Sequence, residues 1–175
     1  MRIRHRTLSL IVSPILAIML PLAAAPARAQ QDRRVTVEAQ GGYAGFLDDA
    51  TIDHGVIGGS LKVGLTPRMR LGPEVVWMRG PGHDRDLFLT GTLTWDMRDP
   101  RPSPRVVPYL IAGGGVMLHR DRFLLESFSS WEGALTGGAG ARVQVTPRLF
   151  VAPEFRIGWE PHYRVGATIG YDLSM

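Results

Sequence analysis

Apolar and polar side chains alternate with a period of two along most of the chain from residue 35 onward. In 57–65, for example, Ile57 and Leu61 fall on one face, and Ser60 and Lys62 fall on the other. A period of two is the spacing of side chains on a β-strand, and no stretch has the sustained spacing of an amphipathic helix. Strands are therefore predicted over 35–43, 57–65, 71–77, 87–96, 109–117, 135–145, 149–159 and 163–173.

The stretch 109–117 is the least polar of the eight. One face carries Tyr109, Ile111, Gly113 and Met117, and the other carries Leu110, Ala112, Gly114 and Val116. The pattern predicts a strand here.

A near-repeat supports this arrangement of strands. Residues 65–74 line up with 145–154, and each segment has a Thr-Pro-Arg sequence followed by an apolar strand with Pro-Glu. Proline presets the backbone for the second position of a tight turn, so each segment predicts a hairpin. The two halves of the chain resemble each other, or two short turns converged on the same chemistry; both interpretations predict the same hairpins.

Residues 1–29 have the pattern of an export signal. Arg2, Arg4 and Arg6 precede an apolar run over 8–22, and Ala27-Arg28-Ala29 provides a small-residue cleavage site. Prolines at 14 and 21 interrupt the run, which argues against a membrane anchor. We therefore expect a cleavable signal peptide over 1–29 and one domain over 30–175.

Composition then excludes several functions. Four of the 20 basic residues lie in 1–29, which leaves 16 basic residues facing 16 acidic ones. No positive surface for a nucleic acid is expected from this balance. The chain has no cysteine, so disulfides, thiolate metal sites and cysteine nucleophiles are excluded.

The polar faces of the strands combine charged residues with many glycines. Inside a narrow barrel, glycines would make room for long Arg and Glu side chains that neutralise one another, whereas around a soluble lipocalin-like barrel the same face would simply meet water. Shifting the register by one residue would place arginines in hydrocarbon at about 2–4 kcal/mol each near the membrane centre. We therefore expect an all-β, eight-stranded, antiparallel, up-and-down transmembrane barrel. Its predicted interior charge network comprises Glu38, Lys62, Glu74, Asp96, Arg142, Glu154, Arg156, Arg164 and Asp172.

Large aromatic residues gather near the predicted strand ends. Aromatic belts at both ends of an aliphatic band are typical of a bilayer interface. The predicted girdles are Tyr43, Trp77, Trp131, Trp159 and Tyr163 at one end, and Trp95, Tyr109 and Tyr171 at the other.

The last strand alternates Val165, Ala167, Ile169, Tyr171 and Leu173 and ends on Met175. This pattern resembles the C-terminal signature of bacterial outer-membrane β-barrels, although Met175 stands where those proteins usually have phenylalanine. The segments 107–115 and 146–156 also resemble the small outer-membrane β-barrel domain family. The resemblance implies an outer-membrane protein of a Gram-negative-type cell, in contact with membrane lipid, whose assembly signal (Tyr171, Leu173, Met175) is read by the barrel-assembly machinery.

Four external loops are expected over 46–54, 79–86, 119–130 and 160–162. Each contains one histidine with acidic neighbours: His54, His83, His119 and His162. Such a set could bind a divalent metal or act in catalysis at the outer rim, but no His-x-x-His or His-Glu-x-x-His spacing occurs. We therefore predict no catalytic residue, no metal site and no cofactor.

The expected function is structural, or a contact with an extracellular partner through the external loops. Alternatives that remain open are a lipid-modifying enzyme sited at the rim, with serines 127, 129 and 130 near His119, a soluble periplasmic barrel that binds an apolar ligand, and a narrow channel. Because eight strands leave an interior that side chains just fill, the charged set is expected to be structural.

Overall fold

The computed structural model describes residues 34–47, 51–100, 104–123, 126–159 and 161–173. The predicted signal peptide and Met175 lie outside these residues. Within the described part of the chain, no helix is long and apolar enough to cross a membrane. The chain forms eight strands: β1 (Val35–Leu47), β2 (Thr51–Thr66), β3 (Met69–Arg79), β4 (Arg85–Asp96), β5 (Val106–Phe123), β6 (Glu126–Gln144), β7 (Leu149–Gly158) and β8 (His162–Asp172).

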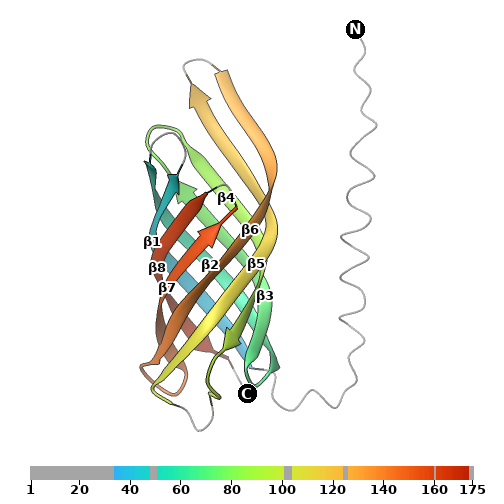
Figure 1. The fold of residues 1–175 in the computed structure, drawn as a ribbon, viewed down its shortest axis with the longest axis vertical. Coiled ribbons are helices and arrows are strands. Elements are labelled where there is room, and N and C mark those ends of the chain that lie inside the picture. Colours follow the sequence, from blue (N-terminus) through green and yellow to red (C-terminus); the bar gives the residue numbers. More distant parts are fainter. Residues whose placement is uncertain (1–33, 48–50, 101–103, 124–125, 160, 174–175) are drawn as a thin grey trace, which may run out of the picture. The chain divides into compact units, whose positions relative to one another are not determined.

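Each strand pairs antiparallel with the next, and β1 pairs with β8 to close the barrel (Figure 1). The predicted eight-stranded antiparallel barrel is thus confirmed. The closing seam aligns Val37 with Tyr171 and Gly42 with Gly166. A Cβ atom on Gly42 would lie 2.3 Å from the carbonyl oxygen of Val165, so the seam requires glycine there. Closure leaves every strand paired along both edges, which removes the exposed edges of an open sheet.

The sides of the strands differ in exposure as the alternation predicts. On β2, the side chain of Lys62 is fully buried, whereas Ile57 is 58% exposed. Arg142 on β6 is likewise buried, while Leu135 is exposed. The polar face therefore lines the lumen and the aliphatic face forms the outer surface. Even the shorter strands, of 10 or 11 residues, have the length of about 9–11 residues needed to cross a bilayer.

The two segments of the near-repeat form hairpins with the same register. Val63 pairs with Leu71 in β2–β3, and Val143 pairs with Val151 in β6–β7, 80 positions later. In the two turns, the hydroxyl oxygens of Thr66 and Thr146 accept hydrogen bonds from the backbone nitrogens two residues on, each at 3.3 Å. The similar sequences thus form hairpins with matching register at these positions, although the β2–β3 pairing shifts register between Gly64 and Thr66.

The structure corrects the predicted loops. We call the end where β1 joins β2, β3 joins β4, β5 joins β6 and β7 joins β8 the loop end, and the opposite end the turn end. Strands extend into all four predicted loop segments, and the β5–β6 hairpin reaches beyond its neighbours (Figure 1). Consequently His54, His119 and His162 lie on strands, and His54 and His162 are buried. His83 is exposed in the connection between β3 and β4.

Candidate functional site

A network of charges fills the middle of the lumen. The guanidinium of Arg156 donates to both carboxylate oxygens of Glu74, at 2.8 and 3.0 Å, and contacts Glu154 at 2.7 Å. Arg164 lies 3.6 Å from the same Glu74 carboxylate. Two cations and two anions thus share one buried group of contacts. A buried charge is tolerated when it is paired and hydrogen-bonded in this way.

A second set of ion pairs lies toward the turn end. Arg142 contacts both oxygens of Asp96 at 3.0 Å, and its guanidinium stacks about 5 Å from the rings of Tyr109 and Phe150. The Thr36 hydroxyl donates to Asp172 at 2.6 Å. Arg70 extends this set, because it donates to the Thr36 oxygen at 3.2 Å and lies 3.7 Å from Asp172.

Arg70 was missing from the predicted network because it was placed at the edge of a turn. The sequence did indicate an inward position, because residues 70, 72 and 74 lie on the same face of a strand and Glu74 faces the lumen. With Arg70 added, the predicted set has five basic and five acidic members. Two of the predicted members find other partners: Lys62 donates to the Thr92 hydroxyl, and Glu38 accepts from Ser60 at 2.5 Å.

The predicted aromatic residues lie on the outer surface with one exception. Tyr109 was expected in a girdle, but its side chain lies inside the barrel, where its hydroxyl donates to Glu154 at 2.7 Å. The prediction was wrong because β5 offers no polarity contrast, whereas its pairing places Tyr109 beside the inward-facing Asp96. The remaining residues are exposed or half-buried: Tyr43, Trp77, Trp131, Trp159 and Tyr163 toward the loop end, and Trp95 and Tyr171 toward the turn end.

An apolar layer in the lumen was not predicted. Met78, Phe88 and Met117 pack together inside the loop-end half, with Val56 and Val76 beside them. The inward faces were identified by their polar residues, so single apolar residues on those faces did not indicate a layer. Met117 of this layer lines the same pocket as the titratable residues at the loop end.

The loop-end cluster consists of His54 on β2, Asp84 before β4, Asp86 on β4 and His119 on β5. The β3–β4 connection has the sequence Gly80-Pro81-Gly82-His83-Asp84. The Asp84 nitrogen donates to the Pro81 carbonyl at 3.3 Å, and Gly82 has a φ of 67°, which glycine adopts without strain. This turn therefore holds Asp84 over the barrel mouth.

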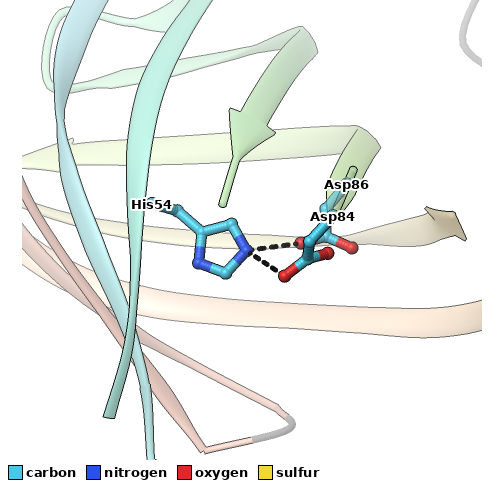
Figure 2. A group of neighbouring side chains, drawn as sticks. All are labelled: His54, Asp84 and Asp86. Carbon is cyan, nitrogen blue, oxygen red and sulfur yellow. Dashed lines mark hydrogen bonds and ion pairs between the residues drawn. The ribbon is translucent and has the colours of Figure 1, made fainter. Parts of the chain in front are cut away.

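Within this cluster, the His54 ring faces two carboxylates (Figure 2). Its Nε2 atom lies 2.9 Å from Asp84 and 3.5 Å from Asp86. His119 Nδ1 lies 2.7 Å from the other oxygen of Asp86. A pocket of about 430 Å³ adjoins the cluster, and its wall includes Glu132. Sequence reasoning grouped these histidines with nearby acids but could not predict which of them meet, because they come from three different strands.

The catalytic alternative requires a serine beside a histidine. In the described side chains, Ser130 donates to Glu132 at 2.5 Å, and the His119 ring lies 6.3 Å from the ring of Phe128. The side chain of Ser127 lies outside the described part. The arrangement of Ser130 does not match a nucleophile activated by histidine, which requires a hydrogen bond between the two.

A closed barrel with an aliphatic exterior and an ion-paired interior has the fold of an eight-stranded outer-membrane β-barrel. The N-terminal barrel domain of OprF from Pseudomonas aeruginosa superimposes with a TM-score of 0.64 and 15% identity, covering 81% of this chain and all of that domain. Neisserial surface protein A superimposes with a TM-score of 0.66 and 12% identity, covering 81% of this chain and 97% of the other. A de novo designed transmembrane β-barrel has a TM-score of 0.51 and 21% identity, with coverages of 80% and 95%.

By sequence, neither a protein-family model nor a curated protein matches the chain. At these identities the structural likeness establishes the fold and leaves the role to be argued from the residues.

Proposed function

We propose that the chain is an integral barrel protein of the outer membrane of a Gram-negative-type cell, without catalytic or channel activity, whose loop end makes contacts outside the cell. Residues 1–29 would direct its export. Its partners would be membrane lipid and, during assembly, the machinery that reads the signal at Tyr171, Leu173 and Met175.

The observation that carries the proposal is the inversion of polarity relative to a soluble barrel. Outward-facing Ile169 is 55% exposed, whereas inward-facing Glu74 and Arg156 are almost fully buried. A water-soluble barrel that binds an apolar ligand would need the opposite arrangement, with aliphatic residues around a cavity. A lipid bilayer removes the outer aliphatic surface from water, and each Arg in the lumen keeps its carboxylate partner.

Two observations argue against the other functions. The Glu74–Arg156–Arg164 contacts cross the lumen and occupy the path that an ion would need, because eight strands leave room for little beyond their own side chains. At the rim, Ser130 is bonded to Glu132 and not to His119. The proposal therefore assigns the charged residues of the middle lumen to stability.

The loop end is the surface proposed for contact. The β5–β6 hairpin extends past the neighbouring strands there (Figure 1). It carries Phe128, whose side chain is more than 60% exposed and which lies nearer the hairpin tip than the girdle residue Trp131. Large exposed aromatic side chains on a protruding hairpin are typical of contact surfaces.

Cell fractionation tests the membrane assignment. The full chain is expected in the outer-membrane fraction, to be released by detergent and not by osmotic shock, and to migrate faster on a gel before boiling than after. Release by osmotic shock alone would refute the proposal. Planar-bilayer recordings of the purified barrel are expected to give no conductance steps, and regular steps would refute the closed lumen.

Cysteine labelling tests which end faces outward, because the chain contains no cysteine of its own. Phe128→Cys, on the β5–β6 hairpin, is expected to react with a membrane-impermeant maleimide on intact cells. Arg148→Cys, in the β6–β7 turn, is expected to react only after the outer membrane is permeabilised. The reverse pattern would place the loop end in the periplasm and contradict the proposed contact surface.

A further inference from the structure

The cluster at the loop end has the donors of a metal site. The Nε2 atom of His54 and one oxygen each of Asp84 and Asp86 all lie within 4.8 Å of one another. They come from β2, from the β3–β4 turn and from β4, and they point toward a common centre (Figure 2). One imidazole and two carboxylates are a donor set that suits Zn²⁺ and similar divalent transition metals.

The orientation of the His54 ring is held by its second nitrogen. Nδ1 lies 3.2 Å from the carbonyl oxygen of Ile52, which can only accept, so Nδ1 carries the hydrogen. Nε2, which makes the 2.9 Å contact with the Asp84 carboxylate, is the atom that binds a metal ion once its hydrogen-bonding proton is released. A hydrogen bond from the other ring nitrogen to a backbone carbonyl is the usual way in which a metal-binding histidine is oriented. The ring of Phe46 packs 4.8 Å away and limits rotation of the imidazole.

The carboxylates of this cluster lack the cationic partners found deeper in the lumen. Among the described residues, the ion-pair partners of Asp84 and Asp86 are His54 and His119. One oxygen of Asp84 is buried without a hydrogen-bond partner. The nearby cations Arg79 and Arg85 lie opposite each other in the register of β3 and β4. Both side chains are exposed on the outer face of the barrel. Nε2 and the two carboxylates therefore converge on one point, where a divalent ion would replace the hydrogen-bonding proton of His54.

We propose that His54, Asp84 and Asp86 bind one divalent transition-metal ion of the Zn²⁺ class at the loop end of the barrel. His119 is a positioning residue, because its Nδ1 lies 2.7 Å from the Asp86 oxygen that does not face His54. The adjoining pocket of about 430 Å³ leaves room for water or an exchangeable ligand on the ion. Three protein ligands with an open position is the arrangement of a reactive or exchangeable zinc site, whereas four protein ligands are usual in a purely structural one.

The test uses the full-length chain folded in detergent micelles and treated with a chelator. Zn²⁺ is titrated by calorimetry, and Co²⁺ is used as a spectroscopic probe of coordination. We expect saturable binding of one ion per chain, competition between the two metals, and no displacement by excess Ca²⁺, which prefers a shell of oxygen ligands. Absence of saturable binding, or equal binding of Ca²⁺, would overturn the proposal.

Variants locate the ion. His54→Gln and Asp84→Asn are expected to weaken Zn²⁺ binding at least 100-fold, and His119→Gln about 10- to 100-fold, the usual range for a residue that orients a ligand. His83→Ala is the matched control, because it removes an exposed histidine next to Asp84 in the same turn and should leave the affinity unchanged. The gel shift on boiling checks that each variant is folded. Should His54→Gln fail to fold, Asp84→Asn decides the question, since its side chain is less deeply buried.

Three outcomes contradict the assignment. Equal affinity of His54→Gln, Asp84→Asn and wild type would show that metal binds elsewhere. Loss of binding in His83→Ala would place the ion in the exposed turn. A His119→Gln variant with wild-type affinity and an unchanged Co²⁺ spectrum would remove the positioning role.

Discussion

The middle of the lumen and its loop end contain similar charged residues in different arrangements. In the middle, Glu74 receives a bidentate contact from Arg156 and lies near a second cation, Arg164. At the loop end, Asp84 and Asp86 face one imidazole nitrogen beside an open pocket. The first arrangement pairs its carboxylate with guanidinium groups, whereas the second pairs two carboxylates with histidines alone among the described residues. The pairing of charges therefore separates stabilising residues from candidate functional ones.

Of the three substitutions that test this comparison, Glu74→Gln is expected to lower the free energy of unfolding the most. The substitution keeps the size of the side chain but leaves Arg156 with Glu154 as its contacting anion and removes the carboxylate that Arg164 contacts. Breaking a buried ion pair by removing one partner costs about 3–5 kcal/mol. The free energy of unfolding, measured by urea titration in lipid vesicles, should fall by that amount. A loss below about 1 kcal/mol would mean that the network contributes little to stability.

Leu89→Arg is expected to have the next largest effect, because Leu89 lies in the middle of β4 on the outer face. An arginine near the membrane centre costs about 2–4 kcal/mol, and the cost falls to about 0–1 kcal/mol near the interface. The control is Val145→Arg, since Val145 is exposed at the turn end directly after β6. The same vesicle titration compares the two variants. Equal losses would contradict the assignment of the outer face to lipid.

Asp84→Asn is expected to have the smallest effect on stability. It removes one of two neighbouring carboxylates, and the new amide, which has both a donor and an acceptor, can still form a hydrogen bond with Nε2 of His54. In the presence of a chelator, the free energy of unfolding should stay within about 0.5 kcal/mol of the wild type or rise, as is common when a binding site is relieved of like charges. A loss similar to that of Glu74→Gln would show that the loop-end cluster is itself a stabilising network.

Much of the fold was predictable because the side chains of a strand alternate with a period of two. The placement of Lys62, Glu74 and Arg142 in the lumen could be predicted from the alternation of polar and apolar residues alone. The two Thr-Pro-Arg turns then predicted hairpins at 65–74 and 145–154, which have the same register. Prediction failed at Tyr109, where neighbouring residues of both parities are apolar and alternation has no contrast.

The loop end was less predictable, since its residues meet through pairing of several strands. Acidic residues near His54 and His119 suggested polar loops, and the strands in fact continue through these positions. The distance of 2.9 Å between His54 and Asp84 joins residues 30 positions apart. No local spacing encodes such a contact, so a search for metal-binding sequence motifs could not find it.

The sequence by itself determined that this protein forms strands, which residues share a face, and that the charged face contains nearly balanced ions. These properties follow from the geometry of a single strand and from composition. Only the tertiary structure decided which carboxylate meets which cation. It also decided which histidine lies beside two carboxylates. Those contacts depend on closure of the barrel and on the relative register of its strands, and both are properties of the complete sheet.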